Sequence, residues 1–191
     1  VADILISGFL IILSIPIYFI VAILIKIEDN GPIFYKQERT GKYGDKFEII
    51  KIRSMKLDAE LSGPKWSKLN DKRVTKVGYY LRKLRIDEIP QLILVFKGTM
   101  SLIGPRPERP IMEKKLIKDI NFYSLRYNVK PGISGWAQVN YNYGASTKDS
   151  NIKLSYDLFY VKNYSFLLDI VTFFKTLKVV FNGYGSDPLK R

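Results

Sequence analysis

Two adjacent carboxylates, Asp87 and Glu88, are the residues of this chain best suited to chemistry. They lie within Arg85–Leu92, in a protein whose formal net charge is +13. An acidic pair among so many cations indicates a site that handles phosphate together with a divalent metal. A carboxylate can attack a phosphoryl group to give an acyl phosphate, which divides a difficult transfer into two easier steps. The transferred and leaving phosphates would then need Mg²⁺ and cationic side chains to absorb their charge.

Several basic side chains could stabilise such phosphates, namely Arg82, Arg85, Lys51, Arg53 and Arg106. We expect Asp87 to cap a helix that continues through Pro90, since proline is tolerated in a first turn. Both carboxylates would then lie at the positive end of the helix dipole, which keeps Asp87 ionised and leaves Glu88 able to hold a metal. Taken alone, ordinary helix capping is the better explanation of the pair, and Arg106 between two prolines also fits a surface loop.

Composition limits the chemistry that is available. The 191 residues suit one domain with a real core. The chain contains no histidine and no cysteine, which excludes imidazole bases, thiolate nucleophiles, the usual zinc sites and disulfides. Carboxylates, hydroxyls, Lys, Arg or an oxygen-bound metal such as Mg²⁺ remain. The excess of 31 Lys and Arg over 18 Asp and Glu suits nucleic acid, an anionic membrane or a phosphorylated small molecule, and charge alone does not choose among them.

An uncharged apolar stretch occupies the N-terminal part of the chain, from Ile4 to Ile25. At about 1.5 Å per residue, a helix of this length could cross a hydrocarbon core of roughly 30 Å. Pro16 near its middle should kink or break the helix, so that it either spans the bilayer or turns at 14–16 and returns. The basic sequence after Lys26 is expected to be cytoplasmic. A fully buried core helix is the alternative.

A small antiparallel hairpin is predicted after this stretch. Its strands are expected at 33–37 and 46–53, and the glycines of 41–45 mark the turn between them. The residues that follow, 54–71, combine a helix start with a polar loop.

Helices and rigid loops account for the rest of the predicted elements. Apolar residues at helical spacing predict a helix over 74–84, and a second helix over 89–96 ends at a Lys-Gly pair. Prolines and glycines predict loops at 104–110 and 130–138, where binding groups tend to lie. A last helix over 156–181 carries one polar stripe, so that it either packs on the domain or lies in a membrane interface.

Five ordered blocks of the chain match a known family pattern, namely Gly31–Arg39, Lys51–Met55, Leu84–Leu92, Gly98–Pro107 and Lys130–Asn140. By these blocks the chain resembles the bacterial sugar transferase family, the monotopic phosphoglycosyl transferases that start lipid-linked glycan assembly. The resemblance covers essentially all of the sequence. It implies an α+β fold that is mainly α-helical, with a Pro-broken re-entrant membrane helix at 1–27, a catalytic domain at 28–191 and amphipathic interfacial helices. The chain has Ser14-Ile15-Pro16 where the family has Ser-Pro.

The resemblance also implies a reaction and a site. A sugar-1-phosphate would pass from a UDP-sugar to undecaprenyl phosphate at the cytoplasmic face of the bacterial inner membrane, in contact with its lipids. By correspondence, Asp87 is the nucleophile, Glu88 binds Mg²⁺, and Arg106, between Pro105 and Pro107, contacts the nucleotide. The supporting active-site candidates are Lys51, Arg82, Gln138 and Asp157. The sequence leaves open which sugar is moved and whether a homo-oligomer forms.

A second hypothesis comes from a different class of protein. A basic, membrane-bound interaction module could recruit nucleic acid or anionic lipid without catalysis. Its binding would weaken steeply with salt and would not depend on Asp87 or Mg²⁺. This hypothesis leaves the acidic pair and the two proline-containing loops unexplained, whereas the transferase interpretation uses them and requires no nucleic acid.

Overall fold

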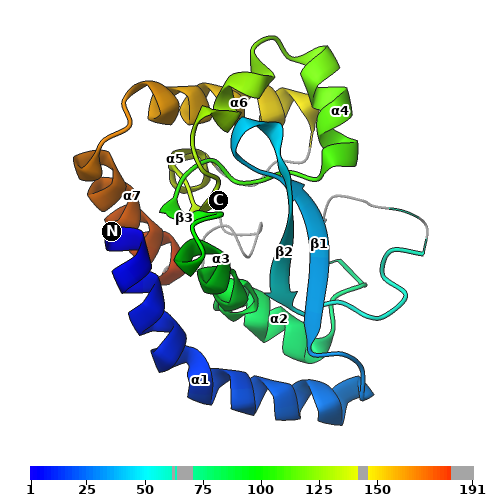
Figure 1. Cartoon of the computed structure of the whole chain (residues 1–191). Coiled ribbons are helices and arrows are strands. Elements are labelled where there is room, and N and C mark those ends of the chain that lie inside the picture. The colour runs from blue at the N-terminus through cyan, green and yellow to red at the C-terminus, as the bar shows by residue number, and fades with distance from the viewer. Residues whose placement is uncertain (62, 64–70, 142–145, 182–191) are drawn as a thin grey trace.

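Helices form most of the structure, with a long hairpin and a pair of very short strands set among them (Figure 1). The computed structural model describes residues 1–61, 63, 71–141 and 146–181. The predicted fold class, α+β and mainly α-helical, is therefore confirmed. The part of the predicted polar loop that covers 62 and 64–70 lies outside the described residues.

The predicted hairpin is confirmed, with strands β1 (Phe34–Thr40) and β2 (Lys46–Ile52) paired antiparallel. A single 3₁₀ turn, η1 (Lys42–Gly44), joins them and uses a left-handed glycine at φ 86°. Ion pairs such as Lys36–Glu48 cover one face of the hairpin, and Ile49 is buried on the opposite face. Ile52, at the end of β2 on the face of Glu48, is buried in a cluster with Val21, Ile25 and Leu81. β2 packs against the 3₁₀ segment η2 (Ile86–Gln91), which carries the acidic pair.

The apolar stretch forms one helix, α1 (Ala2–Asp29), which keeps its helical assignment through Pro16. Proline lacks the N–H that would close this turn, and Figure 1 shows α1 as a bent rod with two arms. The helix therefore bends without breaking into two helices. Among the described residues, α1 alone is long and apolar enough to cross a membrane, with a mean hydropathy of 2.8 over its most apolar part.

Both ends of α1 are bound to the rest of the protein by acidic side chains. Near its start, Asp3 accepts hydrogen bonds from the Ser101 hydroxyl at 2.8 Å and the Leu102 N–H at 3.3 Å. At its other end, Glu28 accepts from the Lys76 N–H at 2.7 Å. Asp29 pairs with the buried side chain of Arg53, the residue that follows β2. Because both ends meet the same domain, both arms of α1 run along its edge (Figure 1).

The helices around the acidic pair are short. α2 (Lys76–Lys83) confirms the helix predicted at 74–84, and Thr75 caps it by accepting from the Gly78 N–H at 2.9 Å. The second predicted helix begins as a 3₁₀ segment, η2 (Ile86–Gln91), and continues as α3 (Leu92–Phe96). Gly98, at φ 80°, ends it as expected.

The two loops predicted from the sequence, at 104–110 and 130–138, agree with the structure to different degrees. Residues 104–109 form the extended loop that its prolines predict, and Pro110 opens α4 (Pro110–Asp119). The second predicted loop was wrong in part, because it contains β4 (Gly132–Ser134) and α5 (Trp136–Asn140). β4 pairs in parallel with β3 (Ser101–Ile103), and this second small sheet was not predicted. A 3₁₀ segment, η3 (Tyr123–Asn128), precedes β4.

The single helix predicted over 156–181 was wrong, because the structure has two helices there. They are α6 (Thr147–Lys162) and α7 (Phe166–Phe181), and the chain changes direction between them at residues 163–165. The chain turns there without glycine or proline, so the apolar pattern hides the break.

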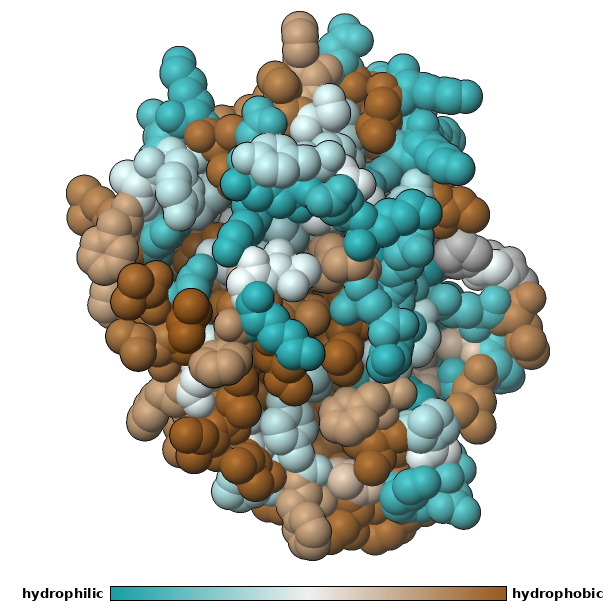
Figure 2. Space-filling view, viewed as in Figure 1, coloured by the Kyte–Doolittle hydropathy of each residue, from teal (hydrophilic) through white to brown (hydrophobic). Residues whose placement is uncertain are grey.

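The polar stripe of α7 faces the protein. The Thr172 side chain is fully buried, Thr176 bonds Ser134 at 2.6 Å, and Asp169 accepts from the Tyr160 hydroxyl at 2.6 Å. The apolar side of α7 is exposed, as is much of α1, and Figure 2 shows apolar surface gathered on the side where these two helices lie. The exposed side chains of α7 include Phe166, Leu167, Phe173, Phe174 and Phe181.

Candidate active site

The acidic pair lies on η2, which packs against β2 of the hairpin. Arg85, the residue before this turn, adopts a left-handed conformation at φ 59°, and no side chain caps the turn. The expectation that Asp87 caps a helix was therefore wrong, because Asp87 lies inside the 3₁₀ turn and not before it. Both carboxylates are nevertheless buried, each with 7% of the residue exposed.

Glu88 is held by two cations that reach it from other parts of the chain. Lys51, on β2, donates from Nζ to Glu88 Oε1 at 2.8 Å. Arg106, from the proline-containing loop, donates to both carboxylate oxygens, through Nη1 to Oε2 at 3.3 Å and through Nη2 to Oε1. Burial acts to raise the pKa of Glu88, but the charges of Arg106 and Lys51 outweigh it and hold this pKa well below its usual range. Glu88 is therefore ionised.

Asp87 has the opposite environment. Its Oδ1 is buried and has no hydrogen-bond partner among the described residues. Burial, followed by the charge of Glu88, raises the pKa of Asp87 to about 6, against the lowering effect of Lys51, Arg82 and Arg85. An acceptor oxygen left without a donor in a buried position is costly unless something else binds it. Asp87 thus combines a free oxygen with unusual basicity for a carboxylate.

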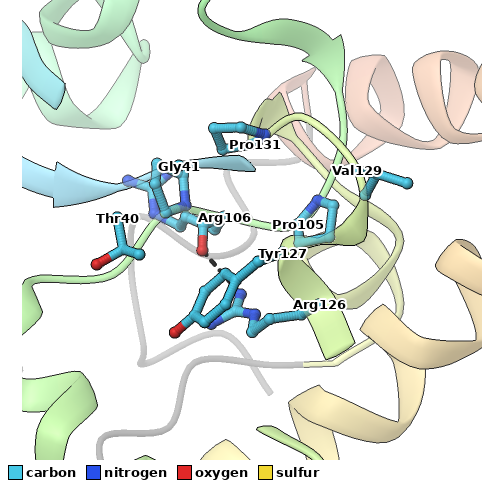
Figure 3. A pocket seen from close by; sticks show the side chains of 9 residues that line it. Thr40, Gly41, Pro105, Arg106, Arg126, Tyr127, Val129 and Pro131 are labelled. Carbon is cyan, nitrogen blue, oxygen red and sulfur yellow. Dashed lines mark hydrogen bonds between the residues drawn. The ribbon is translucent and has the colours of Figure 1, made fainter. Parts of the chain in front are cut away.

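The loop that carries Arg106 borders a small pocket, drawn in Figure 3. Thr40 and Gly41, at the end of β1, lie on one side of it, and Tyr127 lies on another. Arg39, also on β1, donates to the Pro107 carbonyl at 3.1 Å, and the Thr40 N–H donates to the Glu108 carbonyl at 3.1 Å. The hairpin therefore fixes this loop as well as supplying Lys51.

Arg39 is a residue that the sequence reasoning missed as a site candidate. It is the last residue of the block Gly31–Arg39, which supports the family resemblance, but no function was predicted for it. Burial lowers the pKa of its guanidinium to about 10, and the group stays charged at neutral pH.

The other predicted site residues fall into two groups. Arg82 and Arg85 act on Asp87 through their charge. Arg53 binds Asp29 at the end of α1 and the Pro32 carbonyl at 2.7 Å, so the contacts it makes in the structure join α1 to β2. A role for Arg53 in binding substrate remains a prediction.

Gln138 and Asp157 lie on helices beyond the loop. Gln138, on α5, donates to the Ile133 carbonyl at 3.3 Å, and its Oε1 is buried with no partner among the described residues. Asp157, on α6, pairs with Arg126 at 2.7 Å, and Arg126 in turn donates to the Arg106 carbonyl at 2.8 Å. Asp157 thus reaches the site through Arg126.

The acidic pair is also the best candidate to hold a metal. The described residues contain no cluster of three or more carboxylate, imidazole or thiolate groups. Mg²⁺, however, usually binds through one or two carboxylates together with substrate phosphates and water. The free Oδ1 of Asp87 beside the ionised Glu88 fits that mode of binding.

Comparison with known proteins identifies the family. The model of the family described as "Bacterial sugar transferase" matches residues 1–183, which include α1, the hairpin and the acidic pair. The chain therefore belongs to the bacterial sugar transferase family, and the resemblance inferred from the sequence is confirmed.

Three relatives carry names that specify a reaction. One, from Aeromonas hydrophila, is a UDP-N-acetylgalactosamine-undecaprenyl-phosphate N-acetylgalactosaminephosphotransferase, 45% identical over 96% of this chain. Another, from Escherichia coli (strain K12), is a UDP-glucose:undecaprenyl-phosphate glucose-1-phosphate transferase, 36% identical over 95% of this chain. A third, from Salmonella typhimurium, is an undecaprenyl-phosphate galactose phosphotransferase, 35% identical over 83% of this chain. The chain spans 44%, 39% and 35% of their respective lengths.

Proposed function

We propose that this chain transfers a sugar-1-phosphate from a UDP-sugar to undecaprenyl phosphate, through a covalent intermediate on Asp87, and so starts the assembly of a surface glycan. The main support is the contrast within the acidic pair. Asp87 has a free buried oxygen and a pKa raised to about 6, whereas Glu88 is held ionised by two cations. A nucleophile needs the first environment, and a carboxylate ligand for a metal ion needs the second.

In the first step, a carboxylate oxygen of Asp87 attacks the phosphorus that bears the sugar. The new bond is from the Asp87 oxygen to this phosphorus, and the bond from the phosphorus to the bridging oxygen breaks. That oxygen leaves with the electron pair as UMP. Asp87 must be ionised to attack, which its pKa of about 6 permits at neutral pH.

In the second step, an oxygen of undecaprenyl phosphate attacks the same phosphorus. The bond to Asp87 breaks, and its electron pair returns to the carboxylate, which restores the free enzyme. The product carries the sugar on a lipid diphosphate. Each step is a displacement at phosphorus, so catalysis depends on position and on compensation of negative charge.

The residues around the pair provide that compensation. Arg106 and Lys51 both contact Glu88, so they bring two positive charges to where the diphosphate would lie. Asp87 and Glu88 would hold Mg²⁺, which when bound neutralises charge on the phosphates and on the departing UMP. Glu88 would then share its oxygens between this ion and the two basic side chains.

The surface of the protein supports a proposal for its location. Asp3 and Glu28 bind the two ends of α1 to one domain, which supports a re-entrant helix over one that spans the bilayer. The exposed apolar sides of α1 and α7 supply the surface that would enter the lipid. We infer that the protein lies on the cytoplasmic face of the inner membrane, where its basic residues would meet anionic headgroups.

Release of UMP tests this function directly. The purified protein is mixed with Mg²⁺, undecaprenyl phosphate and each of a panel of UDP-sugars, with Asp87→Asn as the matched inactive variant. We expect UMP with one or a few sugars and none from the variant. Absence of UMP with every sugar, together with salt-sensitive binding to nucleic acid or anionic vesicles that ignores Asp87, would favour the interaction-module hypothesis.

A further inference from the structure

Arg126 is a buried arginine of η3 to which the sequence analysis assigned no role. Its side chain is 7% exposed, and it uses its guanidinium in three directions. Nη2 donates to the Arg106 carbonyl at 2.8 Å and pairs with Asp157 Oδ2 at 2.7 Å, while Nη1 donates to the Tyr123 hydroxyl at 2.6 Å. The Tyr123 ring also lies against the guanidinium, 5.1 Å from its central carbon. Arg126 is thus fixed on several sides.

The contact with Arg106 is made to its backbone. Figure 3 shows Arg126 reaching the Arg106 carbonyl, and the dashed line marks this hydrogen bond. The neighbouring Pro107 carbonyl is held by Arg39 from the hairpin, at 3.1 Å. Two guanidinium groups from different elements therefore hold consecutive carbonyls of the same loop. The side chain of Arg106 is left free to bind Glu88.

We propose that Arg126, oriented by Asp157, is a positioning residue that fixes the backbone at Arg106 so that the Arg106 guanidinium meets Glu88. The effect on turnover rests on the proposed function, whereas the effect on the contact between Arg106 and Glu88 does not. Asp157 compensates the buried charge of Arg126, which would otherwise be costly in this position. A planar guanidinium holds its donors in a fixed fork on separate nitrogens, which suits an acid, a hydroxyl and a carbonyl that lie in different directions, whereas the three donors of lysine all radiate from one nitrogen.

The nearest alternative is that Arg126 and Asp157 form an ordinary buried ion pair. Such a pair would support the fold without any particular effect on Arg106, and its loss would reduce stability and activity in every background alike. Positioning predicts a different result. A residue that acts through Arg106 should matter only while Arg106 is present.

A kinetic double-mutant cycle distinguishes the two cases. We expect Arg126→Lys to lower kcat/KM about 10- to 100-fold, in keeping with misplacement of a charged group in the site. In an Arg106→Ala background the same substitution should cost less than about twofold. Equal losses in both backgrounds would overturn the proposal. Arg109→Lys is the matched control, because Arg109 pairs with Glu60 at 2.6 Å near the same loop and should leave kcat/KM unchanged.

A second double-mutant cycle measures stability and does not require catalytic activity. Arg126 and Glu88 share Arg106 as a common partner. Unfolding temperatures of Arg126→Lys, Glu88→Gln and the double variant should therefore be coupled, with the double variant losing less than the sum of the single losses. Additive losses would refute positioning even in a protein that released no UMP. Absence of UMP from the wild type combined with coupled stabilities would instead reject the proposed function and retain the positioning.

Discussion

Asp87 and Glu88 are neighbours in the chain, yet their carboxyl groups lie in opposite electrostatic environments. Glu88 accepts from Lys51 and Arg106, and its pKa is held well below the usual range. Asp87 has an unpartnered oxygen, and its pKa is raised to about 6. Two adjacent residues of one 3₁₀ segment thus hold a fixed anion and a carboxyl group with an unpartnered oxygen. The same pattern, in which environment assigns different roles to two acids, is common in active sites.

The two acids should affect stability with opposite signs. Because the pKa of Asp87 is higher in the folded protein than its ordinary value of 3.8, its ionisation weakens the fold as pH rises through about 6. Without Mg²⁺ at pH 7.5, Asp87→Asn should therefore raise the free energy of unfolding by about 2 to 3 kcal/mol, and the gain should vanish as pH falls toward 3.8. Thermal unfolding in detergent with EDTA measures this.

Glu88→Gln should destabilise the protein under the same conditions. Loss of the Glu88 carboxylate leaves the charges of Lys51 and Arg106 without an acidic partner, which should lower the free energy of unfolding by roughly 2 to 4 kcal/mol. Since the pKa of Glu88 is lowered by folding, this stabilisation is present above the ordinary value of 4.5 and is lost only in more acidic solution. Shifts of the same sign for the two variants would contradict the assigned environments.

The pH dependence of kcat/KM should report the ionisation of Asp87. At low Mg²⁺, activity should fall about tenfold per pH unit below about 6, because protonated Asp87 cannot attack. The charge of Lys51 lowers the pKa of Asp87, so Lys51→Met should move this acid limb to higher pH on its residual activity. A limb that stays in place in the variant would show that another group controls the profile.

The orientation of α1 can be tested by labelling, because the chain has no cysteine of its own. Single cysteines at Ala2 and at Asn30 mark the two ends of the helix. If α1 is re-entrant, a membrane-impermeant maleimide should label both only from the cytoplasmic side of inverted vesicles. Glu38→Cys, on the exposed hairpin, is the control that marks the side of the membrane on which the rest of the domain lies. Labelling of Ala2→Cys from the opposite side alone would establish a spanning helix.

The exposed face of α7 should lie at lipid depth. Phe174 is 64% exposed there, whereas Tyr43, at the tip of the hairpin, is 74% exposed on a different element. A nitroxide at Phe174→Cys should be relaxed mainly by oxygen, which concentrates in lipid, and one at Tyr43→Cys mainly by a water-soluble nickel complex. Equal access of the nickel complex to both positions would place α7 outside the membrane.

The sequence predicts elements with strong local signals. The hairpin and α2 follow from alternation, turn glycines and helical spacing. The pairing of β3 with β4 could not be predicted, since it joins two three-residue strands far apart in the chain. The split between α6 and α7 was missed because the turn has no glycine or proline. The prediction that Asp87 caps a helix was wrong, because the 3₁₀ segment begins one residue earlier, after Arg85. Arg85 adopts a left-handed conformation, which is uncommon for arginine and could not be predicted from the local sequence.

The residues of the site that belong to recognisable sequence motifs could be predicted. Asp87, Glu88 and Arg106 stood out by residue type and by family resemblance, and the structure brings them together with Lys51. Arg126 was missed, because a lone arginine in an ordinary segment has no spacing signal. Only the fold shows that it touches the Arg106 carbonyl.

The most direct test of covalent catalysis is the intact mass of the protein after mixing with Mg²⁺ and its UDP-sugar, without undecaprenyl phosphate. We predict a gain of one phosphosugar group with release of an equal amount of UMP, removal of the group when undecaprenyl phosphate is added, and no gain in Asp87→Asn. An unchanged mass, in a protein that still releases UMP once undecaprenyl phosphate is present, would mean direct transfer and would contradict a nucleophilic Asp87.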